Sequence, residues 1–153
     1  MFFFEKKPVV KAVVLKKEYP FMYEGFTIAT QNILYLLLEE NLGLIDGLSF
    51  PFRIFKFGSP NDEALGSHLM TKYGLSFYGI FEVINSPWIE ELKISNRIHP
   101  SHHDSMFKDY KHYIITYKDN TLEVVSNEMT EIELSKDDLI NIVSEQINYI
   151  KKR

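Results

Sequence analysis

Three of the five histidines in this 153-residue chain lie in the stretch NRIHPSHHDS at positions 96–105: His99, His102 and His103. Imidazole nitrogens can bind a metal ion, transfer protons near neutral pH or form hydrogen bonds within a loop. Pro100 favours an extended backbone at His99, so no helical turn would align His99 with His102. A metal site would need a further ligand, for which Asp104 and His68 are the candidates. The alternative, which the backbone argument favours, is a polar loop capping a helix that begins at Asp104.

A second polar cluster, FGSPNDEALGSH at positions 57–68, follows an expected strand. Loops at strand ends often carry binding residues, and Asn61, Asp62 and Glu63 are the candidates here. The structural alternative is that Ser59, Asn61 and Asp62 cap a short helical turn near Pro60. The chain has no G-x-S-x-G, G-x-G-x-x-G or Walker sequence, so neither a serine hydrolase of that type nor a nucleotide cradle is favoured.

The third feature is Glu82, which lies inside the apolar stretch LSFYGIFEVI at positions 75–84. Alternation predicts a central strand with both faces covered, where an ionised carboxylate would need partners or a raised pKa. If this strand neighbours the following hairpin, Glu82, Glu123 and His112 would line one cleft. The alternative is a row of solvent-facing side chains on an antiparallel sheet.

That hairpin is predicted from HYIITYKDNTLEVVSN at positions 112–127, with Asp119 and Asn120 as a two-residue turn. This register places Thr116 opposite Glu123, and it makes His112 and Thr116 candidate binding residues. The opposite, apolar face consists of Tyr113, Ile115, Tyr117, Leu122 and Val124.

Other patterns predict the elements that position these residues. Strands are expected over 9–16, which is rich in β-branched residues, and over 52–57, which is rich in aromatic residues. TQNILYLLLEEN, at positions 30–41, has the length of a helix, with Thr30 as its cap and Gly43 just beyond its end. The apolar stripe of this expected helix is Ile33, Leu34, Leu37 and Leu38.

Two further helices carry local start signals. Ser86 as N-cap, Pro87 at the first position and glutamates in the first turn predict a helix from Pro87 to about Asn96. Ser135 and Asp138 form a start resembling a capping box for a C-terminal helix. The apolar stripe of that amphipathic helix recurs at Leu139, Val143, Ile147 and Ile150.

Composition and length describe the whole chain as one α+β domain over 1–153, with a mainly antiparallel sheet and two to three packed helices. The chain has no cysteine, which excludes disulfides and thiolate chemistry and fits a reducing compartment. The net charge of −4 disfavours binding to nucleic acid or to anionic membranes. Without a secretory signal or an apolar span, the sequence predicts a soluble, cytoplasmic protein with no bound cofactor. The patterns do not specify an oligomeric state.

Three stretches together, FGSPNDEAL, GLSFYGIFEVINSPWIEEL and NRIHPSHH, are similar to a group of small bacterial proteins of unassigned function. The similarity covers about positions 55–123. It implies no activity, cofactor or catalytic residue.

Two functional hypotheses from different classes follow. The leading one is a non-catalytic protein-binding or regulatory module, of which a toxin-neutralising protein is one example. Its partner would contact an aromatic and acidic surface around Glu128–Asp138. The alternative is a small hydrolase or lyase, with or without a metal ion, whose cleft combines Glu82 and Glu123 with His68 or His99 as acid and base.

Overall fold

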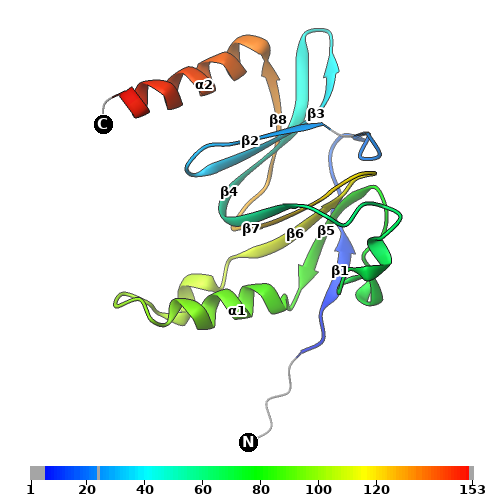
Figure 1. Ribbon diagram of the computed structural model, residues 1–153, viewed down its shortest axis with the longest axis vertical. Coiled ribbons are helices and arrows are strands. Elements are labelled where there is room, and N and C mark those ends of the chain that lie inside the picture. The colour runs from blue at the N-terminus through cyan, green and yellow to red at the C-terminus, as the bar shows by residue number, and fades with distance from the viewer. Residues whose placement is uncertain (1–5, 24, 152–153) are drawn as a thin grey trace, which may run out of the picture.

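The longest strand, β4 (Leu44–Gly58), bends and belongs to two antiparallel sheets in the computed structural model (Figure 1). Its first part pairs with β3 (Ile33–Asn41) on one side and with β8 (Thr130–Ser135) on the other. Its second part pairs with β7 (Thr121–Ser126). The structure describes residues 6–23 and 25–151.

The remaining strands extend the two sheets outward from β4. The first sheet ends with β2 (Phe26–Ala29), which pairs with β3. The second continues from β7 through β6 (Lys111–Thr116) and β5 (Gly79–Ile84) to β1 (Val9–Ala12). The predicted α+β class with a mainly antiparallel sheet is confirmed, with eight strands and two α-helices in the described residues.

The main core lies between the two sheets. It combines β3 and β4 side chains such as Leu34, Leu48 and Phe50 with Tyr113 and Leu122 from the second sheet. A smaller core lies on the opposite face of the second sheet, where Leu65 and Met70 pack against Phe81 and Ile114. Two short 3₁₀ turns, η1 (Leu65–Ser67) and η2 (Thr71–Tyr73), help to cover this outer face.

The prediction of a helix over positions 30–41 is wrong, because most of this segment forms β3. Leu34, Leu36 and Leu38 alternate into the main core, and Leu37 is buried as well, so both faces of the strand are covered. The apolar run therefore fits a strand and a helix equally well. The turn residues Leu42 and Gly43 have φ values of 51° and 83°, as a two-residue β-hairpin turn requires.

Both helices with local start signals are present. In α1 (Pro87–Asn96), the Ile89 N–H donates to Ser86 Oγ at 3.2 Å, which confirms the N-cap. In α2 (Lys136–Lys151), Ser135 and Asp138 exchange hydrogen bonds of 2.8 and 3.1 Å between side chains and backbone, as in a capping box. The helix expected at Asp104 is a single 3₁₀ turn, η3 (Asp104–Phe107).

The hairpin β6–β7 forms with a register that differs from the prediction. Thr116 pairs with Thr121, and Glu123 pairs with Ile114 instead of Thr116. A slip of two residues leaves every side chain on the same face, so the predicted apolar face of the hairpin does enter the main core. No helix within residues 6–23 and 25–151 is both long and apolar enough to cross a membrane.

Candidate functional site

A chain of four polar side chains runs across the outer face of the second sheet. Ser86 Oγ lies 2.7 Å from His112 Nδ1, and His112 Nε2 lies 2.8 Å from Glu123 Oε1. The second oxygen of Glu123 lies 3.1 Å from His68 Nε2. Three of these residues, Ser86, His112 and Glu123, are buried. Three members of this buried cluster, His68, His112 and Glu123, are among the candidate residues that the sequence pointed to.

The direction of each hydrogen bond follows from what each group can donate. An ionised carboxylate only accepts, so both His112 and His68 donate Nε2–H to Glu123. His112 Nδ1 is then the acceptor, and the Ser86 hydroxyl donates to it. His68 Nδ1 likewise accepts the backbone N–H of Met70 at 3.0 Å. Each of these four polar side chains has a hydrogen-bond partner, which offsets the cost of burying it.

Charge states in the cluster are set by burial and by these hydrogen bonds. Burial alone would raise the pKa of Glu123, but hydrogen bonds from His112 and His68 outweigh it and lower the pKa to about 2. Burial lowers the pKa of His112 and outweighs the opposing effect of Glu123. At neutral pH the cluster therefore holds an ionised Glu123 beside a neutral His112.

Two side chains from other elements cover this cluster. The Trp88 ring of α1 meets the His112 ring edge-on, with centroids 5.1 Å apart. Lys56 Nζ of β4 lies 4.2 Å from the Trp88 ring centroid and 3.8 Å from Glu123 Oε2. The cation thus interacts with an aromatic face and a carboxylate together.

Glu82 does not join this cluster, so the expected cleft of Glu82, Glu123 and His112 is wrong. Glu82 is paired with Tyr113, which faces the main core, whereas Glu123 is paired with Ile114 on the opposite face. Its carboxylate lies 3.7 Å from Lys111 Nζ. Alternation along a strand shows which residues share a face but does not show which face that is.

Three of the candidate binding residues make structural contacts. Asn61 Oδ1 accepts the Ala64 N–H at 3.0 Å and so caps the turn that follows. Asp62 accepts the Tyr78 hydroxyl at 2.6 Å. The buried Thr116 donates to Ser76 O and accepts from Gly79 N, which joins β6 to the start of β5. Glu63 is exposed to solvent.

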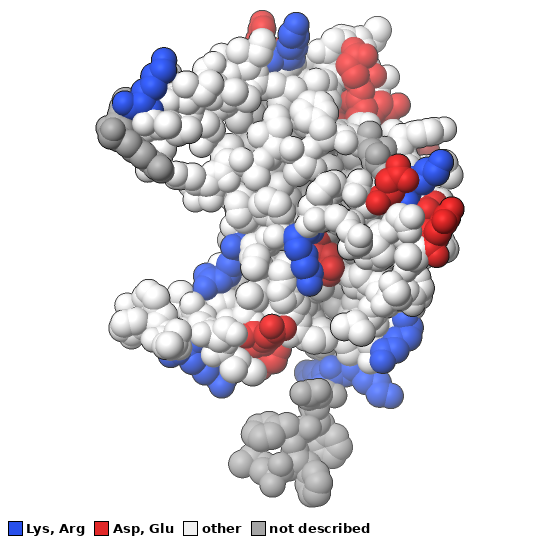
Figure 2. All heavy atoms as spheres, in the orientation of Figure 1, with Lys and Arg blue, Asp and Glu red and all other residues white. Residues whose placement is uncertain are grey.

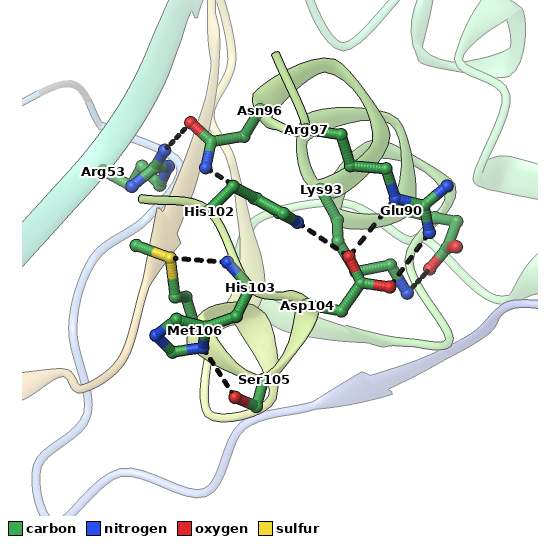
Figure 3. Close-up of polar contacts among 10 residues, drawn as sticks. All are labelled: Arg53, Glu90, Lys93, Asn96, Arg97, His102, His103, Asp104, Ser105 and Met106. Atoms are coloured by element: carbon green, nitrogen blue, oxygen red, sulfur yellow. Dashed lines mark hydrogen bonds and ion pairs between the residues drawn. The ribbon is translucent and has the colours of Figure 1, made fainter. Parts of the chain in front are cut away.

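The histidine-rich stretch forms a polar loop between α1 and η3 (Figure 3). His102 accepts from Asn96 Nδ2 at 2.7 Å and donates to Asp104 at 2.7 Å. Arg97 adds two hydrogen bonds to Asp104, and these charged contacts hold the pKa of that carboxyl well below its usual range.

The other two histidines of this loop turn to local partners. His99 Nδ1 accepts the Ser101 N–H. His103 Nδ1 lies 2.7 Å from Ser105 Oγ, as Figure 3 shows. Among the residues that the structure describes, no group of three or more His, Asp or Glu side chains is arranged to hold a metal ion. Within residues 6–23 and 25–151, no hydrogen bond or ion pair joins His99 to the buried cluster.

The apolar face of α2 is a different kind of candidate site. Ile140, Val143, Ile147 and Ile150 recur on one side of the helix, and each is exposed by between 45% and 62%. No side chain of α2 is buried. The space-filling view shows α2 as an arm above a hollow, with α1 on the other side of that hollow (Figures 1 and 2).

Sequence reasoning missed one member of the buried cluster, Ser86, and the two side chains that cover it, Lys56 and Trp88. Ser86 was identified only as a helix cap, because a cap and a partner for histidine have the same local sequence. The available signal was that NSPW places a hydroxyl at the corner between a strand and a helix. No family model matches this chain, and comparisons with curated proteins and with solved structures also found no match.

Proposed function

We propose that this chain is a protein-binding module whose contact surface is the apolar face of α2. The proposal rests on the stripe of Ile140, Val143, Ile147 and Ile150. These side chains recur regularly along one side of the helix, as on a helix that packs, yet they are exposed to solvent. Isolated apolar side chains on a surface are ordinary, but a contiguous stripe of this kind is typical of protein contacts.

The partner of α2 is a protein with an apolar surface, because the stripe contains no charged residue. Two acidic residues of the surface expected around Glu128–Asp138 are already engaged in contacts within the fold. Glu131 accepts the backbone N–H groups of Lys16 and Lys17 and the hydroxyl of Tyr19, and Glu133 is paired with Lys17. We therefore assign the contact surface to α2 itself, which overlaps the expected acidic surface around Glu128–Asp138 only in its first turn.

The test compares a stripe variant with a matched variant on the polar side of the same helix. Ile147→Asp places a charge in the stripe, whereas Asn141→Asp places one on the opposite side. The tagged wild-type chain and both variants are used for affinity capture from cells that naturally make the protein, and their masses are measured by light scattering.

We expect wild type and Asn141→Asp to form the same stoichiometric complex, either with another protein or with a second copy. Ile147→Asp should weaken it by about tenfold or more, since a charge in an apolar contact must be desolvated. An identical mass and an identical set of captured proteins for all three chains would contradict the proposal.

A further inference from the structure

Ser86, His112 and Glu123 are linked in the order hydroxyl, imidazole, carboxylate, with contacts of 2.7 and 2.8 Å. This is the bonding order of a nucleophile, its general base and the group that orients the base. Here the imidazole uses Nδ1 toward the hydroxyl and Nε2 toward the carboxylate. We propose that these residues form a catalytic site that hydrolyses small carboxylic esters through an acyl-enzyme on Ser86.

The charge states fit the roles. A general base has to be unprotonated before the reaction, and His112 is neutral at neutral pH because its burial disfavours the charged form. Glu123 is ionised, so it stabilises the imidazolium that forms during proton transfer. Glu123 and its second partner His68 are positioning residues, because neither touches the reacting atoms.

The backbone around Ser86 presents it at a tight corner between β5 and α1. Asn85, directly before it, has a φ of 57°, a strained conformation of the kind that accumulates at functional sites. Ser86 is followed by the first turn of α1, whose N-terminal end favours negative charge. The Trp88 N–H belongs to this first turn and is a donor for the oxyanion of a tetrahedral intermediate.

For this reaction, substrate has to reach the corner from the surface. Ser86 itself is 8% exposed, but its neighbours Asn85 and Pro87 are both exposed. Two shallow hollows border residues 12–21, and neither includes Ser86. The proposed substrate is therefore limited to a small ester whose carbonyl reaches the Ser86 hydroxyl while most of the molecule stays in solvent.

The reaction balances with water as the co-reactant. Ser86 Oγ forms a bond to the carbonyl carbon while His112 Nδ1 takes its proton, and that proton passes to the departing alcohol oxygen as the ester C–O bond breaks. Water then attacks the acyl carbon and gives a proton to His112. The carboxylic acid leaves as the proton returns to Ser86 Oγ.

The first test uses the wild-type chain with a fluorophosphonate probe and with 4-nitrophenyl acetate. We expect the probe to label Ser86, as located by peptide mass. Ser86→Ala should lose the label and about a hundredfold or more in hydrolysis rate, whereas Ser101→Ala, in an exposed loop, should change neither. Absence of labelling, labelling at another residue, or equal rates for wild type and Ser86→Ala would overturn the proposal.

A second test separates catalysis from the helix-capping role of Ser86. The chain has no cysteine, so Ser86→Cys introduces a single thiol. If His112 takes its proton, this thiol should react with iodoacetamide at pH 6 about tenfold faster than the thiol of Ser101→Cys. A cap that is only structural predicts the reverse, a buried thiol that reacts more slowly than the exposed one.

Discussion

At the residue scale, Glu123 is the most constrained side chain of the buried cluster, since both of its oxygens accept from histidine. Depression of its pKa from 4.5 to about 2 corresponds to about 3 kcal/mol of folding free energy at neutral pH. The contribution arises because the hydrogen bonds from His112 and His68 outweigh the cost of burying the charge. The cluster is thus also a structural link among the η1–η2 loop, β6, β7 and α1.

A pH prediction follows from the cluster. The lowered pKa of Glu123 stabilises the fold above pH 4.5, and this contribution is lost as the pH falls toward 2. His112 acts in the same direction: the unfolded chain takes up its proton near pH 6.5, before the folded chain does. Wild type should therefore lose stability in two steps on acidification, as measured by urea unfolding between pH 7 and pH 3.

Glu123→Gln removes the second step of this acid destabilisation, the step that depends on Glu123. This variant should be less stable than wild type by about 3 kcal/mol at pH 7, and the difference should shrink to about 1 kcal/mol at pH 3. Glu63→Gln, at an exposed carboxylate, serves as the control. A difference between wild type and Glu123→Gln that is the same at both pH values would contradict the assignment of the charge to the folded state.

At the element scale, α2 begins with a strong local signal and packs little. Replacing Ser135 with alanine removes the side-chain half of its cap, which is worth about 1 kcal/mol. Because no side chain of α2 is buried, we expect fraying of its first turn and no loss of the fold. Amide hydrogen exchange at residues 138–140 should accelerate about fivefold, with an unchanged urea midpoint.

The control for this cap variant is Ser144→Ala, in the middle of the same helix, which should neither accelerate exchange nor lower the urea midpoint, because alanine favours the helix. If Ser135→Ala instead lowered the urea midpoint and raised exchange evenly along the chain, α2 would be an integrated part of the folding unit.

How well each element could be predicted depended on how local its determinants are. The starts of α1 and α2 follow from Ser86, Pro87, Ser135 and Asp138, whose capping contacts lie within one turn. β3 could not be predicted in this way, because its identity depends on pairing with β4 and on burial of both faces. The same limit affected Glu82, whose face is decided by which neighbours the sheet provides.

The candidate site, likewise, could be predicted only in part from the sequence. His68, His112 and Glu123 were identified by residue type, and the hairpin pattern placed two of them on one face. Their contact with each other and with Ser86 joins segments that are far apart in the sequence. Spacing along the chain carries little information about such contacts.

At the scale of the whole molecule, stability depends on the core between the two sheets. Phe50 on β4 is fully buried and its ring lies 5.5 Å from that of Tyr113 in the other sheet. Phe50→Ala should therefore cost about 3–5 kcal/mol of unfolding free energy, measured by urea denaturation. Phe57, on the same strand, is 54% exposed, and Phe57→Ala should cost less than about 1 kcal/mol. Equal losses for both variants would show that the core does not lie between the sheets.

The strand pairing of β4 limits the order in which the fold can be completed. The partners of β4 on one side, β7 and β8, come from the later part of the chain, so they leave the ribosome long after β4 does. During synthesis one edge of this long apolar strand therefore remains unpaired, and unpaired strand edges promote aggregation. The many pairings between distant segments also predict slow folding, in milliseconds to seconds. A cell making this protein therefore has to protect β4 until the last strand arrives.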